Sequence, residues 1–272
     1  MRQTEHAKRN TMQLHHTSLG SGEPLIVLHG LLGSHQNLLP ACRKFAEHFQ
    51  VFAIDQRNHG HSPHHDEMSY ELMAADVVRF MDAHRLATAH VLGHSMGGKT
   101  AMHLALHHPT RVNKLVVADM SPRAYGPRFA KLLHALRELR PEQFKTRVEA
   151  DQALAPSVPE ESLRQFLLKN LAPGEHGGYR WRMNLESIAT NYDHLREAVH
   201  SAIPFTGEAL FVLGGNSDYV GEADKAEIHR LFPSAQFTSI AGAGHWVQVE
   251  KPAEFAEAVV IFLKRWPGST ML

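Results

Sequence analysis

The sequence of 272 residues lacks several features that identify particular classes of protein. Its single cysteine, Cys42, excludes an intrachain disulfide and a zinc site built from cysteines. Lys plus Arg and Asp plus Glu both number 28, so no net charge attracts the chain to nucleic acid or to an anionic membrane. No apolar run approaches the roughly 20 residues of a membrane-spanning helix. We therefore expect neither a nucleic-acid partner nor a membrane span.

A secretion signal is also missing from the start of the sequence. Residues 1–9 (MRQTEHAKR) contain no apolar stretch like the one at the centre of a signal peptide. Cys42 is expected to be a partly buried helix residue and not a catalytic thiol. Together these observations predict a reducing, cytoplasmic location.

Histidine, in contrast, is abundant, with 22 residues that include three adjacent pairs at 15–16, 64–65 and 107–108. Adjacent residues point to different faces of a strand or helix, so such a pair rarely binds one metal ion. The spacing His-Glu-x-x-His is absent as well. We predict that most of these histidines lie at the surface. The sequence therefore gives no reason to expect a metal site or a cofactor.

Short apolar runs recur along the chain and predict the strands of a sheet. They cover residues 25–28, 51–54, 91–92, 115–118 and 210–213, and a last strand is expected at 236–240. Helical patterns lie between them, for example the one that follows Ser69 and the one over residues 101–106. Continuously apolar strands that alternate with helices predict an α/β protein with a mostly parallel sheet covered on both faces.

This alternation stops between residues 122 and 204. The stretch has helical stripes, at 129–136 and at 166–171, which prolines separate, and it has no strand-like run. The simplest interpretation is a helical cap inserted between two strands, lying over the carboxyl ends of the sheet. Residues 1–121 and 205–272 then form the core, and residues 122–204 form the cap.

Residues 93–100 (GHSMGGKT) satisfy two catalytic motifs at once. Read as G-x-S-x-G, they form a nucleophile elbow, a sharp strand-to-helix turn that exposes the hydroxyl of Ser95. Read as G-x-x-x-x-G-K-T, they form a complete Walker A loop in which Lys99 faces phosphates. A strand-like run precedes the motif and a helical pattern follows it, so the local context fits both.

The rest of the chain supplies the other parts of a serine hydrolase. A general base is available in His245, which lies in a glycine-rich loop (AGAGHW) between the last strand and a terminal helix that begins at Pro252. Backbone N–H groups of Leu31 and Met96 are the candidates for an oxyanion hole, because one follows the first strong strand and the other follows Ser95.

The acid that would orient the histidine is ambiguous. Asp218 follows the strand after the predicted cap, and Asp119 ends the strand after the elbow helix. Both positions lie at the carboxyl edge of the predicted sheet, so either carboxylate could reach His245. Each could equally be an aspartate in a turn or at a helix cap.

The phosphate-loop interpretation leaves the loop at His245, the turn after the first strand and the cap unexplained. Walker loops also usually open the first strand–helix unit, whereas this one follows two earlier units. We therefore keep an NTPase as a remote alternative. Lys99 is then expected to be an ordinary residue early in the elbow helix.

The chain resembles the α/β-hydrolase superfamily over essentially its whole length, and more narrowly the YbfF-type esterases and their mitochondrial abhydrolase-domain relatives. The motifs that carry the resemblance are 55–64 (DQRNHGHSPH), 68–71 (MSYE), 93–102 (GHSMGGKTAM), 119–122 (DMSP), 166–170 (FLLKN), 181–185 (WRMNL), 214–217 (GGNS) and 243–246 (AGHW). The resemblance implies the α/β-hydrolase fold and a serine hydrolase of esters or thioesters, with Ser95 and His245 in its catalytic triad. It also favours Asp119 as the acid, with Asp218 in reserve, and gives Ser217 an assisting role.

We accordingly expect an esterase for small-molecule esters of short- to medium-chain acyl groups, with thioesters as further candidate substrates. A C–C bond hydrolase, a lyase and a cofactor-free haloperoxidase use the same triad and stay open as alternatives. A protein that binds a ligand without catalysis is, like the NTPase, a remote one.

Overall fold

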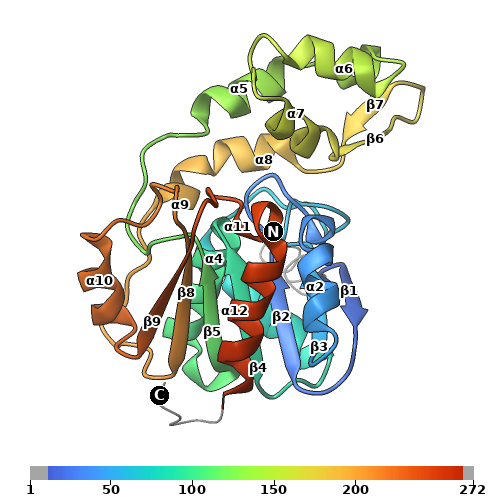
Figure 1. Ribbon diagram of the computed structural model, residues 1–272. Coiled ribbons are helices and arrows are strands. Elements are labelled where there is room, and N and C mark those ends of the chain that lie inside the picture. Colours follow the sequence, from blue (N-terminus) through green and yellow to red (C-terminus); the bar gives the residue numbers. More distant parts are fainter. Residues whose placement is uncertain (1–11, 266–272) are drawn as a thin grey trace.

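The computed structural model describes residues 12–265, and its centre is one seven-stranded sheet (Figure 1). The amino-terminal residues on which the expectation of no secretion signal depends lie outside this range. All neighbouring strands are parallel except β1 and β3. From edge to edge the strands are β1 (His16–Leu19), β3 (Gln50–Ile54), β2 (Pro24–Leu28), β4 (Ala89–His94), β5 (Val112–Ala118), β8 (Glu208–Gly214) and β9 (Ala235–Ile240). The predicted parallel sheet is confirmed.

Each of the six predicted strands lies within an observed one. The antiparallel edge strand β1 (HTSL) is not predicted, because it contains only one strongly apolar residue and its side chains are at most half-buried. An edge strand pairs on one side only, so it needs no continuous apolar run.

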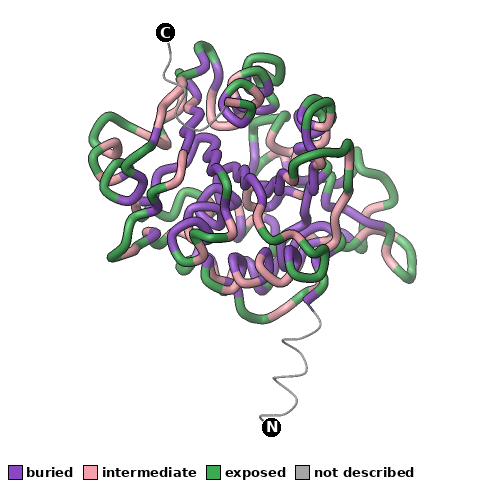
Figure 2. The backbone as a smooth tube through the Cα atoms, turned by 90° about the horizontal axis from the view of Figure 1, so that it is seen from below, coloured by how far each residue is buried: buried purple, intermediate pink, exposed green. Residues whose placement is uncertain are grey.

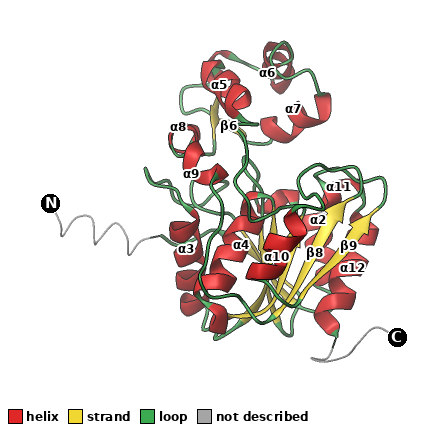
Figure 3. Cartoon of the chain, turned by 90° about the vertical axis from the view of Figure 1, so that its left-hand side faces the viewer, coloured by secondary structure: helices red, strands yellow, loops and turns green. Residues whose placement is uncertain are grey.

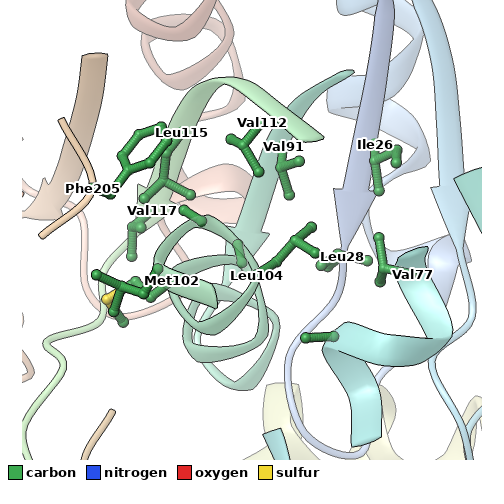
Figure 4. Packing of buried hydrophobic residues seen from close by; sticks show 14 of the residues in the cluster. Ile26, Leu28, Val77, Val91, Met102, Leu104, Val112, Leu115, Val117 and Phe205 are labelled. Atoms are coloured by element: carbon green, nitrogen blue, oxygen red, sulfur yellow. The ribbon is translucent and has the colours of Figure 1, made fainter. Parts of the chain in front are cut away.

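Helices cover both faces of the sheet because its strands are apolar on both faces. Along β2, Ile26 and Leu28 belong to one apolar layer and Leu25 and Val27 to the other, as the alternation of side chains in a strand requires. The first layer, part of which Figure 4 shows, lies against α3 (Tyr70–Ala83), α4 (Met96–His107) and α10 (Asp224–Leu231). The second lies against α2 (Leu39–Phe45), α11 (Val247–Glu250) and α12 (Pro252–Lys264).

The local signals that begin these helices are the expected ones. The hydroxyl of Ser69 accepts the N–H of Leu72 at 3.3 Å and caps α3, and Pro252 is the first residue of α12. Cys42 lies in α2 as expected, but it is fully buried and not partly buried. Burial raises the pKa of its thiol to about 12, which makes it an inert packing residue.

The segment between β5 and β8, residues 122–204, is called the insertion segment below. Figures 1 and 3 both show its helices over the end of the sheet from which β5 leads into it. The segment contains α5 (Ala130–Glu138), α6 (Arg147–Leu154), α7 (Glu161–Leu168), α8 (Leu185–Thr190), α9 (Tyr192–Arg196) and the 3-10 helix η3 (Pro141–Gln143). Its apolar side chains form one cluster with core residues such as Met73 and Met96, so the two regions share a packed boundary.

The expectation that residues 122–204 contain no strand is wrong. Strands β6 (Leu171–Pro173) and β7 (Tyr179–Trp181) form an antiparallel pair, so Leu171 belongs to a strand and not to a helical stripe. Each has only three residues, which is too short for an apolar pattern to show. The chain reverses through Gly177 and Gly178, whose positive φ angles suit glycine.

Figure 2 shows that the buried parts of the chain gather at the centre, with exposed turns around them. We predicted that most histidines lie at the surface, but several are buried in the core. Within residues 12–265, the buried histidines are His29, His35, His59, His90 and His94. Among the described residues, no helix has the length and apolar character required to cross a membrane.

Candidate active site

Ser95 occupies a strained turn between β4 and α4. Its φ of 54° and ψ of −117° lie in a region that costs a non-glycine residue about 1–3 kcal/mol. The glycines of the motif allow the tight packing that imposes this turn. A Cβ atom on Gly93 would lie 2.0 Å from the carbonyl oxygen of Gly97, and one on Gly97 would lie 2.4 Å from that of Leu28. The G-x-S-x-G pattern is therefore a steric requirement of the turn.

The structure brings His245 to Ser95 from the far end of the chain. Its Nε2 lies 3.0 Å from Ser95 Oγ. Two further contacts fix the histidine. Its ring stacks on Tyr219 with 3.5 Å between the ring centroids, and His94 Nε2 lies 2.9 Å from its carbonyl oxygen. Burial, and then the charge of His245, lowers the pKa of His94 to about 3, so His94 is neutral and serves as an N–H donor.

Of the two candidate acids, the structure places Asp119 at the histidine. Asp119 Oδ2 lies 2.8 Å from His245 Nδ1, and this side chain is almost fully buried. The N–H of Gly214 donates to Oδ1 at 2.9 Å, and the hydroxyl of Ser217 donates to Oδ2. Asp218 instead lies exposed at the surface, where both of its oxygens accept hydrogen bonds from Arg128 at 2.7 and 2.8 Å.

The two predicted oxyanion donors, Leu31 and Met96, line the same small cavity as Ser95. Met96 is the first residue of α4, so its N–H has no acceptor within the helix. Leu31 follows β2, and its neighbours are held in place: Leu32 N–H donates to His59 Nε2 at 3.1 Å and Gly33 N–H donates to Gly30 O at 3.1 Å. This loop therefore presents the backbone of Leu31 from a rigid turn.

Two buried histidines support that loop, and the sequence analysis gave them no role. His59 Nδ1–H donates to the Arg57 carbonyl at 2.9 Å, which leaves its Nε2 to accept the N–H of Leu32. His29 repeats the arrangement, with Nδ1 at 2.8 Å from the Gly30 carbonyl and Nε2 accepting the N–H of Gln56 at 3.0 Å. For His59, the motif DQRNHG was the available signal in the sequence, but it does not reveal that the partner of His59 is the N–H of Leu32.

One group of side chains has a composition that suits a metal ion. Donor atoms of His15, His35 and Asp55 lie within 4.8 Å of one another. Each Asp55 oxygen, however, already accepts two hydrogen bonds, Oδ1 from the backbone and ring of His35 and Oδ2 from the ring of His15 and the backbone of His61. We interpret the group as a hydrogen-bond network that holds the 3-10 helix η1 (His35–Asn37) against the core.

Two cavities meet at Ser95. The larger has a volume of about 710 Å³, and its wall is mainly apolar, with His245 from the core and residues such as Phe129 and Phe166 from the insertion segment. The smaller has a volume of about 40 Å³ and lies between Ser95, Lys99 and Tyr125. The hydroxyl of Ser95 is therefore reachable from one roomy and one narrow side.

Chemically, the arrangement can activate a hydroxyl group. A histidine within hydrogen-bond reach of a serine can remove its proton, and a carboxylate on the other ring nitrogen fixes the tautomer and stabilises the imidazolium. Two backbone N–H groups beside the serine can stabilise a developing oxyanion. This geometry can support acyl transfer.

Comparison with known proteins agrees with the fold and the chemistry. A family model described as "alpha/beta hydrolase fold" matches residues 23–252. The sn-1-specific diacylglycerol lipase ABHD11 of Xenopus laevis is 39% identical over 251 residues, which cover 89% of this chain and 80% of that one. The esterase YbfF of Escherichia coli is 36% identical over 245 residues, which cover 89% and 94%. A solved structure of a marine microorganism esterase has a TM-score of 0.90 at 41% identity and covers 93% and 100% of the two chains.

These matches cover 80% to 100% of the relatives' own length, and the family model spans most of the described chain. The resemblance found in the motifs is therefore confirmed. The chain belongs to the α/β-hydrolase fold family and is an ester hydrolase.

Proposed function

We propose that the protein is a serine esterase in which Ser95, His245 and Asp119 form the catalytic triad. The observation that carries this proposal is the continuous chain of contacts from Ser95 Oγ through the imidazole to Asp119, at 3.0 and 2.8 Å. Ser217 assists by donating its hydroxyl hydrogen bond to the same carboxylate oxygen that faces the histidine.

The reaction follows from the positions of these groups. His245 takes the proton of Ser95 as Oγ attacks the carbonyl carbon of the ester, and the backbone N–H groups of Leu31 and Met96 bind the oxyanion. The tetrahedral intermediate expels the alcohol, which receives the proton from His245. Water, deprotonated by the same histidine, then attacks the acyl-enzyme, releases the acid and restores Ser95.

We propose that the insertion segment acts as a cap over this site. Its support is the larger cavity, whose wall combines core residues with Phe129, Leu132, Leu163 and Phe166 from the segment. An apolar wall of this kind favours apolar acyl or alcohol groups. The substrates we infer are esters of short- to medium-chain acids, together with thioesters. Because the Xenopus laevis relative is a diacylglycerol lipase, a diacylglycerol belongs in the substrate panel.

Activity-based labelling tests the nucleophile directly. A fluorophosphonate probe should label the wild-type protein and fail to label Ser95→Ala, and the same variant should lose about 10⁶-fold in kcat for p-nitrophenyl esters. Equal labelling of both proteins would refute the role of Ser95. A panel of acetyl, butanoyl and octanoyl esters and thioesters, together with a diacylglycerol, then defines the substrate, and no hydrolysis of any of them by a labelled protein would refute the proposed substrate class.

A further inference from the structure

Two stretches at the base of the insertion segment, residues 122–126 and residues 195–199, are called its two connections to the core below. They lie side by side, because Tyr125 N–H donates to the Arg196 carbonyl at 2.8 Å and Val199 N–H donates to the Pro122 carbonyl at 2.7 Å. The position of the insertion segment relative to Ser95 therefore depends on the conformation of these two connections.

Lys99, four residues after Ser95, bonds to both connections. Its side chain is only 1% exposed, and its Nζ donates to the carbonyl of Arg123 at 2.8 Å and to the carbonyl of Glu197. The same ammonium lies over the rings of Tyr70 and Tyr125, at 5.6 and 5.0 Å from their centroids. In a Walker loop this ammonium would bind phosphate, but here it is already bound to carbonyls and aromatic rings of the protein. The expectation that Lys99 is an ordinary residue of the elbow helix is therefore wrong.

No carboxylate lies among the hydrogen-bond partners of this ammonium within residues 12–265. Burial, and then the charge of Arg123, lowers the pKa of Lys99 to about 7, although the charge of Glu197 opposes the shift. A neutral amine still has two N–H groups for the two carbonyls. The bond to both connections is therefore available in either protonation state.

Lys99 also forms a wall of the smaller cavity, beside Ser95 and Met96. The other walls include Tyr70 and Tyr125, the two rings that the ammonium contacts. The hydroxyl of Tyr70 donates to the carbonyl of Leu195 at 2.5 Å, at the start of the second connection. The size of this cavity therefore depends on Tyr70 and Tyr125, and the ammonium of Lys99 contacts both rings.

We propose that Lys99 is a specificity-determining positioning residue, which ties both connections to α4 and keeps the smaller cavity too narrow for more than a methyl- or ethyl-sized group. A cavity of about 40 Å³ exceeds the roughly 10–15 Å³ that one water molecule needs, but not by enough for a longer chain. The substrate class is then an ester with one small group next to the carboxyl function and one bulky apolar group in the larger cavity. This inference rests on the proposed role of Ser95.

Two series of esters test the size limit. In the first, the acyl group of p-nitrophenyl esters grows from acetyl to butanoyl to octanoyl, and in the second, the alcohol of alkyl octanoates grows from methyl to propyl to hexyl. For the wild-type protein, kcat/KM should fall at least 10-fold along one series and change little along the other. Lys99→Met has nearly the same length without donors, and it should reduce that fall to less than 3-fold.

Lys114 supplies a matched control. It is also buried, donates to the carbonyls of Phe262 and Arg265 at 3.2 and 2.7 Å, and lies over the ring of Phe262. Unlike Lys99 it also pairs with a carboxylate, that of Glu208 at 2.9 Å, and it lies at the opposite end of β5 from Asp119. Lys114→Met should lower the melting temperature without changing the ratio of kcat/KM values along either series.

The outcomes separate the two proposals. Unchanged size dependence in a folded Lys99→Met protein that fluorophosphonate still labels overturns this inference alone, as does a wild-type protein without a size limit in either series. An equal change in Lys114→Met also overturns it, because the effect would then be one of stability. Loss of Ser95-dependent labelling in the wild type overturns the esterase proposal first. If Lys99→Met does not fold, Lys99→Gln, which keeps two N–H donors, should give a smaller change in the same direction.

Discussion

The core and the insertion segment differ in how firmly they fix their side chains. The core places Ser95, Asp119 and His245 at the ends of long buried strands or in the loops that follow them, between two apolar layers. The insertion segment contains α-helices of five to nine residues and two strands of three residues, most of its buried apolar side chains belong to one cluster, and Val148 and Ile203 are largely exposed there. The proposed reacting groups thus come from the core, and much of the cavity wall comes from the region that can vary without disturbing them.

Of the variants that compare the two regions, the largest difference in kcat is expected between two aspartate variants. Asp119 lies inside the core, and Asp218 forms an ion pair with the insertion segment. Asp119→Asn removes the charge that faces His245 and permits the wrong tautomer, so kcat should fall about 10⁴-fold. Asp218→Asn breaks only an exposed ion pair with Arg128, which contributes about 0–1 kcal/mol.

Steady-state kinetics on both variants, with melting temperatures as the check of folding, gives the comparison. A near wild-type kcat for Asp119→Asn together with a large loss for Asp218→Asn would reverse the assignment of the acid.

A second comparison uses two glycines. A Cβ on Gly97 would lie 2.4 Å from the Leu28 carbonyl, whereas one on Gly126, in the connection to the insertion segment, would meet nothing within 4 Å. We expect Gly97→Ala to destabilise the protein by about 3 kcal/mol or more through backbone strain. Gly126→Ala should change the free energy of unfolding by less than about 1 kcal/mol. Urea denaturation measures both, and a stable Gly97→Ala protein would show that the elbow tolerates more space than its geometry indicates.

The core is easier to predict from sequence than the insertion segment, because its strands are buried on both faces and the elements of the insertion segment are short. The strand at 25–28 is visible as an apolar run because both of its faces are buried, and the elbow is visible because sterics require its glycines. Strands β6 and β7 are invisible because three residues carry no pattern. Short elements of the insertion segment depend on contacts that are distant in sequence.

Within the site, position in the predicted sheet did not distinguish Asp119 from Asp218, since both follow strands that end at one edge, and only the motif resemblance favoured Asp119. The choice depends on the turn at Asp119, whose φ is 48° and whose oxygen accepts the N–H of Gly214. The role of Lys99 was also hidden, because its partners are backbone carbonyls 24 and 98 positions away. Every residue has a carbonyl, so no residue type marks such a partner.

Acid should weaken the core more than the insertion segment. Burial is the main cause that lowers the pKa of His59 from 6.5 to about 3. Between these values the unfolded chain binds a proton that the folded chain does not, so stability is present above about pH 6.5 and falls as the pH drops toward 3, by about 1.4 kcal/mol per pH unit for each such group. The histidines of the insertion segment, such as His134 and His176, are exposed.

The urea midpoint should therefore fall between pH 7.5 and pH 4.5, and less steeply for His59→Gln than for the wild type. His134→Gln is the control, and it should follow the wild-type curve. Identical pH dependence in all three proteins would contradict the assignment of His59 as a neutral, buried support of the oxyanion loop.

The smallest effect should come from the wall that the insertion segment contributes. Phe166 lines the larger cavity and lies 5.9 Å from the ring of Trp246, measured between centroids. Phe166→Ala removes apolar contact that the substrate makes equally before and in the transition state. This contact contributes about 1 kcal/mol, so KM for octanoyl esters should rise about 5-fold with kcat nearly unchanged. Val148→Ala, at an exposed position of the same segment, should change neither constant. A loss of kcat in Phe166→Ala would mean that the insertion segment positions the reacting groups as well, and the division between a rigid catalytic core and a variable wall would then no longer hold.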